Sequence, residues 1–160
     1  MLRVALESGS QSMETIVRLM LEYGMDLNGE MENAWSVLHD AAYTGSEDVI
    51  RLLIKHGADT KARYSNGWTA LHPATLRGHT RAARVLLEYG VSMDAKDESG
   101  WTALHIAATR GDNEMIELLL DHGAELDWRT QDGSLLGGLS WARISHTCLN
   151  STRREHRSKR

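Results

Sequence analysis

Histidine is the residue type in this sequence best suited to acid–base or metal chemistry, and the 160 residues include eight of them. His39, His72 and His105 recur at intervals of 33 residues, which places them one structural repeat apart and too distant to share a metal ion. A weaker combination of one thiol and two imidazoles lies near the C-terminus: His146, Cys148 and His156. In a polar segment, one thiol and two imidazoles usually occur together by chance, so we do not predict a metal site there. No zinc-protease motif, nucleophile elbow or phosphate-binding loop occurs, and no nucleophile–base pair stands out. We therefore expect a protein that is not an enzyme, with no catalytic residue, no metal and no cofactor.

Composition supports a soluble intracellular protein. Hydrophobic residues make up 41% and charged residues 25% of the chain, enough for a sizeable core. A single cysteine, Cys148, cannot form an intrachain disulfide. Apolar runs are too short to span a membrane, and the N-terminus lacks the apolar stretch of a secretory signal. We expect a cytoplasmic location, with the nucleus as the alternative, and no membrane partner.

The net charge of −4 hides an uneven distribution along the chain. Residues 1–142 contain 12 Lys and Arg against 21 Asp and Glu, whereas residues 143–160 contain six basic residues against one acid. A basic tail therefore follows an acidic body. We interpret this basic tail as a disordered segment that increases solubility. The alternative is a nuclear or nucleic-acid-associated factor acting through this tail, although an acidic body is unsuited to gripping phosphates, so nucleic acid is an unlikely partner.

The chain repeats itself with a period of 33 residues. Three stretches align without gaps, at residues 34–59, 67–92 and 100–125. In each, a Ser or Thr that suits a helix N-cap is followed three residues later by the recurring histidine, which can return a hydrogen bond as Glu does in a capping box. A short helix of small residues then ends at glycine, and a second helix with an apolar stripe follows. About a dozen turn-forming residues connect one unit to the next.

These motifs strongly resemble the ankyrin repeat. The characteristic tetrapeptide appears as SVLH, TALH and TALH, and the closing motif as GAD, GVS and GAE. The resemblance covers about residues 12–128 and implies an all-α solenoid of helix–turn–helix units with projecting hairpin loops. It divides the chain into a degenerate N-terminal unit, three repeats, and an aborted repeat with a disordered basic tail: residues 1–30, 31–63, 64–96, 97–129 and 130–160.

Two departures from the pattern fall in the 64–96 repeat. Pro73 stands at about the fourth position of the first helix and removes an early helical hydrogen bond, so this helix should begin irregularly. Ala82 and Ala83 replace the Val49 and Ile50 of the preceding repeat. We expect the middle of the array to be its most weakly packed layer.

The two ends of the array differ. Residues 13–26 predict the second helix of a terminal unit, and residues 2–8 predict a degenerate first helix. At the other end the register is lost abruptly at Gly137 and Gly138. Residues 134–160 are either a capping segment or an unrelated tail on a truncated array, and we favour the tail. An under-capped end would then promote self-association.

The resemblance implies that a protein partner binds the hairpin tips and the inner helices, which form a concave groove. Candidate protein-binding residues on that groove are Trp35, Trp68, Trp101, Asn33, Asn66, Tyr43, Arg77 and Arg110. Further cations recur at the 33-residue spacing between units: Arg63, Lys96 and Arg129. Aromatic and arginine side chains are typical of protein–protein hot spots, and the arginines favour an acidic partner segment. The tryptophans have a structural alternative, in which they cover the hairpin base, and they could serve both roles. A methyl-lysine cage is a third, weaker reading.

Overall fold

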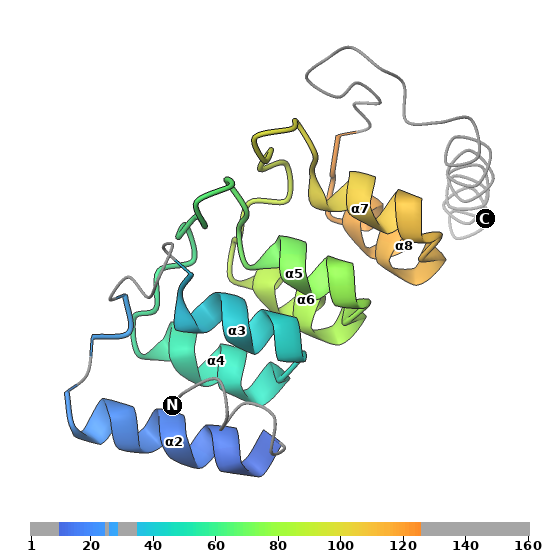
Figure 1. Cartoon of the computed structure of the whole chain (residues 1–160). Helices are drawn as coiled ribbons and strands as arrows, with labels where there is room; N and C mark the ends of the chain where they lie inside the picture. Colours follow the sequence, from blue (N-terminus) through green and yellow to red (C-terminus); the bar gives the residue numbers. More distant parts are fainter. Residues whose placement is uncertain (1–9, 25, 29–34, 126–160) are drawn as a thin grey trace.

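The computed structural model describes residues 10–24, 26–28 and 35–125 as a stack of helix pairs (Figure 1). The helices are α2 Ser10–Glu22, α3 Val37–Thr44, α4 Glu47–Lys55, α5 Leu71–Arg77, α6 Thr80–Glu88, α7 Ala103–Arg110 and α8 Asn113–Asp121. Within these ranges no residue is in a β-strand, which confirms the prediction of an all-α fold. Several predicted features lie outside the described residues: the helix at residues 2–8, Asn33, Arg129, and the segment 130–160 with its basic tail.

The helices form two rows. The first helices of successive units, α3, α5 and α7, pack side by side in an inner row, while α4, α6 and α8 form an outer row behind them (Figure 1). Helix α2 packs against α4 and so continues the outer row, which is the position predicted for the second helix of an N-terminal unit. The connections between units extend from one end of the helix pairs as loops.

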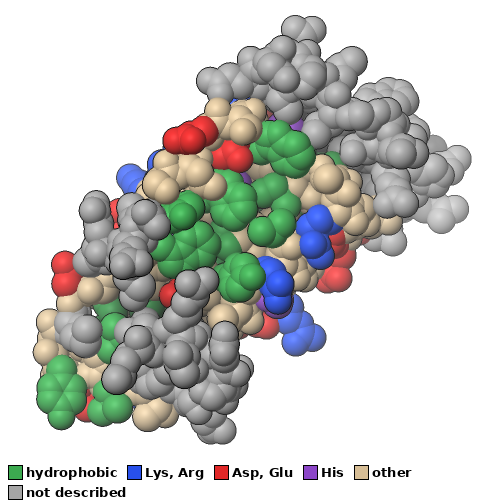
Figure 2. All heavy atoms as spheres, in the orientation of Figure 1, with side chains coloured by type: hydrophobic (Ala, Val, Ile, Leu, Met, Phe, Trp, Pro, Cys, Tyr) green, Lys and Arg blue, Asp and Glu red, His purple; other side chains and the backbone are tan. Residues whose placement is uncertain are grey.

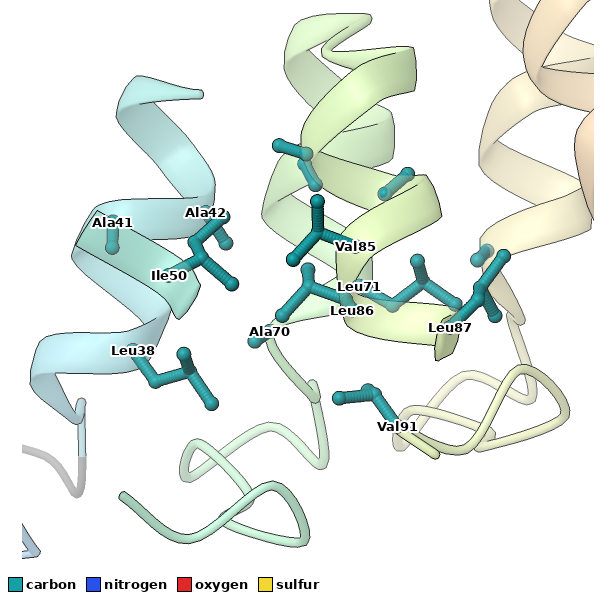
Figure 3. Close-up of a cluster of buried hydrophobic side chains, with 14 of the residues drawn as sticks. Leu38, Ala41, Ala42, Ile50, Ala70, Leu71, Val85, Leu86, Leu87 and Val91 are labelled. Atoms are coloured by element: carbon teal, nitrogen blue, oxygen red, sulfur yellow. The ribbon is translucent and has the colours of Figure 1, made fainter. Parts of the chain in front are cut away.

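A continuous apolar core fills the space between successive pairs. Figure 3 shows Leu38 and Ile50 of one pair directed toward the next pair, which contributes Leu71 and Leu86 to the same core, and all four are at most 1% exposed. Alanines of the inner helices α3 and α7 lie in this core beside larger apolar side chains of the outer helices α4 and α8. Small side chains allow neighbouring inner helices to approach closely, so the units stack with a regular register.

The first helix of the 64–96 repeat begins one residue later than its counterparts. Helix α7 starts immediately after its cap, Thr102, whereas α5 starts at Leu71, two residues after Thr69. The carbonyl of Thr102 accepts a hydrogen bond from Ile106 N at 3.2 Å, but Pro73 has no N–H to make the equivalent bond. The predicted irregular start is therefore confirmed.

The turn between α3 and α4 rests on a side chain of the following unit. Gly45 adopts φ +76°, and a Cβ placed on it would lie only 2.6 Å from Cγ of His79. The ring of His79 is held there because its Nε2 lies 3.1 Å from the carbonyl oxygen of Tyr43. Glycine at this turn is thus required both by the backbone conformation and by the neighbouring ring.

The connections fold as hairpin-like loops that are joined to one another. Tyr64 N donates to Trp68 O at 2.7 Å, and Asp97 N donates to Trp101 O at 2.9 Å in the next loop. Between the two loops, Glu98 N donates to the carbonyl oxygen of Asn66 at 3.0 Å. The guanidinium of Arg63 donates to carbonyl oxygens in both loops. This cation therefore holds the loops together, and its expected place beside the groove stays a prediction.

Candidate protein-binding face

Each first helix is fixed by its histidine. Thr69 N donates to Nδ1 of His72 at 3.1 Å, and the hydroxyl of Thr69 lies 3.1 Å from the same atom. The same arrangement recurs between Ser36 and His39 and between Thr102 and His105. Because a backbone N–H can only donate, Nδ1 must accept, and the proton of the neutral imidazole is on Nε2. The predicted reciprocal cap is confirmed.

The second ring nitrogen links neighbouring units. Nε2 of His39 lies 3.1 Å from the carbonyl oxygen of Trp68, and Nε2 of His72 lies 3.4 Å from that of Trp101. Both carbonyls are 29 residues downstream, in the loop that introduces the next unit. The repeated histidines are therefore buried structural residues, and both ring nitrogens of His39 and His72 are hydrogen-bonded. Among the described residues, no cluster of three His, Cys, Asp or Glu side chains is arranged to hold a metal ion.

Acid should destabilise the array through these histidines. Burial lowers the pKa of both His39 and His72 below the usual value. Protonation would also place a second donor on Nδ1, opposite a backbone N–H. The unfolded chain therefore takes up protons first, at about pH 6.5, so stability is full above that value and falls as the pH drops below it. We expect the melting temperature to fall between pH 7.5 and 5.5.

A glutamine variant provides the control for this pH dependence. The double substitution His39→Gln/His72→Gln keeps hydrogen-bonding groups at both positions but removes both titrating rings. Melting curves of this variant should depend less on pH than those of the original chain over the same interval. An unchanged slope, or a melting temperature that rises on acidification, would contradict the assignment.

The tryptophans are half-buried, and each packs against the histidine of its own unit. The ring centroids of Trp68 and His72 are 5.8 Å apart and the two rings are stacked at 13°. Trp35 and Trp101 lie 5.1 and 6.3 Å from their histidines in tilted arrangements. Trp35 also meets Tyr64 edge-on at 5.0 Å. These contacts show that the tryptophans cover the caps of the inner helices.

The indole N–H groups distinguish the three tryptophans. Trp35 donates to a carboxylate oxygen of Asp40, and Trp68 donates to Asp97 at 3.2 Å. In the next repeat the position equivalent to Asp40 is Ile106. The indole N–H of Trp101 makes no hydrogen bond within the described residues. Two indoles are thus engaged internally, whereas no residue that the structure describes accepts from the third.

Tyr43 and Arg77 form a pair on the solvent side of the inner row. The Cζ atom of Arg77 lies 4.8 Å from the centroid of the Tyr43 ring, a cation–π geometry that joins α3 to α5. Tyr43 is 42% exposed, and Arg77 is exposed as well. The structure therefore brings two of the predicted site residues together.

Arg110 occupies the position on α7 that Arg77 occupies on α5. It is exposed, and its Nη2 atom would lie 3.4 Å from a Cβ placed on Gly78, at the end of α5. A carboxylate oxygen of Asp112 has the same separation from that point. Arg110 forms no hydrogen bond or ion pair with any residue in the described part of the chain.

Asn66 supports the loop on which Trp68 lies. Its Oδ1 accepts a hydrogen bond from Trp68 N at 3.1 Å, and its backbone carbonyl accepts the bond from the next loop. A side chain used in this way organises the tip. Asn33, the equivalent candidate in the preceding repeat, lies outside the described residues.

These residues form one surface, which we call the inner face: the exposed side of α3, α5 and α7 with the tryptophans that precede them. Figure 2 shows apolar side chains gathered along its middle, acidic side chains at the loops, and basic side chains toward the opposite ends of the helix pairs.

Sequence reasoning missed Asp40 and Asp97 as partners of the tryptophans. Neither acid recurs at the 33-residue spacing, so the repeat gave no signal for them.

Stacked helix pairs with an exposed, chemically varied inner row define a helical repeat protein. A family model described as ankyrin repeats, in three copies, matches the sequence over residues 1–64 and again over residues 59–130. The chain therefore belongs to the ankyrin-repeat family, whose domains generally mediate protein–protein interaction. No curated protein matches the sequence closely enough to count as a relative. No helix in the described part of the chain has the length and apolar character needed to cross a membrane.

Proposed function

We propose that the chain is a non-catalytic adaptor that binds another protein through the inner face. The observation that carries this proposal is the exposed pair of Tyr43 and Arg77. Tyrosine and arginine are enriched among the residues that dominate binding energy at protein interfaces. Here they stand on a rigid helical row, and the cation–π contact holds the arginine in place before any partner arrives. A preorganised side chain loses less entropy on binding.

Within this proposal the tryptophans have different roles. Trp35 and Trp68 are primarily packing residues, because their rings lie on histidines and their N–H groups donate to carboxylates. Trp101 packs in the same manner, but no acceptor for its N–H lies within the described ranges, so we assign it both roles. The same proposal includes the unit boundaries at residues 31–63, 64–96 and 97–129. It also includes a cytoplasmic location, with the nucleus as the alternative. The basic tail lies outside the described residues, and the alternative function through it stays a prediction.

Two tyrosines of equal exposure provide the test. Tyr43 on the inner row is 42% exposed, and Tyr89 at the end of the outer helix α6 is 41% exposed. The full-length chain and the variants Tyr43→Ala and Tyr89→Ala are compared by affinity capture and quantitative mass spectrometry. A partner bound through the inner face should be retained by Tyr89→Ala. Its capture by Tyr43→Ala should fall about tenfold or more, the effect of losing a hot-spot side chain.

Melting curves accompany the capture experiment. Both tyrosines are substantially exposed, so neither substitution should change the melting temperature by more than a few degrees. If both variants retain every partner, or if Tyr89→Ala alone loses it, the inner face is not the binding site.

A further inference from the structure

The carboxylates of Asp40 and Asp97, beside the tryptophans of the inner face, accept hydrogen bonds from donors within the chain. One carboxylate oxygen of Asp97 accepts from the backbone N–H groups of Ser99 and Trp101, each at 2.8 Å. The other oxygen accepts from the indole of Trp68. Asp40 is engaged by Trp35 in the same manner. Their negative charges are therefore directed toward internal donors.

The arginines of the same face, Arg77 and Arg110, make no hydrogen bond or ion pair with any residue that the structure describes. Arg77 contacts only the ring of Tyr43, which leaves all its N–H donors open to a ligand in the described structure. Arg110 lies beside Gly78 and Asp112 but is hydrogen-bonded to neither. The charge that the inner face can offer to a partner is thus positive, although residues 1–142 carry a net charge of −9. A local basic site on an acidic body selects for acidic groups at short range and not for polyanions in general.

The two guanidinium groups are separated by one repeat. Each arginine ends its helix and leans toward the preceding unit: Arg77 lies over Tyr43 of α3, and Arg110 approaches Gly78 at the end of α5. Adjacent packed helices lie about 8–10 Å apart, so the two positive groups have about that separation. In a polyproline II segment, which has three residues per turn and rises about 3.1 Å per residue, side chains three residues apart lie on the same face and about 9 Å from each other.

We propose that the inner face binds a segment of the partner in the polyproline II conformation that carries two carboxylates three residues apart, one for Arg77 and one for Arg110. This inference deepens the proposed function and rests on it. A guanidinium binds a carboxylate through two parallel N–H···O bonds, which fixes the orientation as well as the position of each acid. The indole N–H of Trp101, for which residues 10–24, 26–28 and 35–125 provide no acceptor, is a donor for a further acceptor of the same segment.

Peptide selection on the full-length chain tests the spacing. The probe is a phage-displayed library of random dodecapeptides, selected on the immobilised chain and eluted with salt. Enriched sequences should carry Asp or Glu at positions i and i+3. Synthetic versions with either acid changed to its amide should bind about tenfold more weakly, and moving one acid by a single residue should have a similar effect.

Two pairs of arginines provide matched variants. Arg77→Gln/Arg110→Gln and Arg81→Gln/Arg84→Gln remove the same charge, but the second pair lies on the exposed side of the outer helix α6. The first variant should lose about tenfold to a hundredfold in affinity for the selected peptides and most of the salt dependence. The second should bind nearly as well as the original chain.

The outcomes separate this inference from the proposed function. Peptides that lack acids, that carry them at a helical spacing of i and i+7, or that bind both arginine variants equally would overturn the acidic-segment proposal. If such peptides still lost affinity with Tyr43→Ala but not with Tyr89→Ala, the inner face would remain the binding site. Peptides insensitive to every inner-face substitution would overturn both.

Discussion

Gly45→Ala should lower the free energy of unfolding by about 3 kcal/mol, from two separate costs. Gly45 has φ +76°, a left-handed conformation that costs a residue with a side chain about 1–2 kcal/mol. The new Cβ would also lie 2.6–2.8 Å from three atoms of the His79 ring. The ring cannot withdraw without losing its contact with the carbonyl of Tyr43, so overpacking adds about 1–3 kcal/mol.

Gly57→Ala separates the two costs. Gly57 also has a positive φ, +92°, but a Cβ there would have no neighbour within 4 Å. This variant should therefore lose only the backbone contribution, about 1–2 kcal/mol, in urea unfolding. In the double variant Gly45→Ala/His79→Ala the steric part should disappear, although the contact to Tyr43 is lost as well. Equal losses for Gly45→Ala and Gly57→Ala would show that the ring yields without strain.

His72→Ala should be equally damaging, with a loss of about 3 kcal/mol or more. The side chain is completely buried, so its removal leaves a cavity at the junction of two repeats. It also leaves the N–H of Thr69 and the carbonyl of Trp101 without their present partner, and a buried unsatisfied group costs about 1–3 kcal/mol. The loss should appear as a lower urea midpoint.

His56→Ala is the comparison for this substitution. His56 is exposed and contacts only a carbonyl of its own helix, so its replacement should change stability by less than about 1 kcal/mol. His72→Gln should recover part of the loss, because its amide can reach the same groups from a smaller volume. If His72→Ala and His56→Ala were equally stable, the histidine would not link the two units.

The sequence alone could predict the features that recur. The 33-residue spacing of histidine, tryptophan and glycine predicted the helix pairs, and the Ser or Thr three residues before each histidine predicted the caps. Pro73 was a local exception with a local physical effect, a missing N–H, so the late start of α5 could also be foreseen. Propensity and capping act over a few residues, and such effects can be predicted from a sequence.

Contacts between units could not be predicted in the same way. The stacking of His79 beneath Gly45 and of Arg77 on Tyr43 joins residues 34 apart, and each contact occurs at one junction only among the described units. The tryptophans show the same limit, because the Gly-Trp-Thr motifs at residues 67–69 and 100–102 are identical, yet within the described part of the chain a carboxylate accepts from the indole of Trp68 and none accepts from that of Trp101. Such contacts depend on side-chain directions across the stack, and the spacing of residues does not specify them.

The histidine bonds to downstream carbonyls have a consequence for how the array folds and frays. The capping histidines of α3 and α5 make both of their ring hydrogen bonds only when the loop of the following unit is docked, since the acceptor lies 29 residues further along. In a one-dimensional chain of repeats, such a bond belongs to the interface between neighbours and not to either unit alone. It strengthens nearest-neighbour coupling and gives it a direction. Hydrogen exchange should therefore show a lost unit exposing the caps of the unit before it, so that opening spreads toward the N-terminus more readily than away from it.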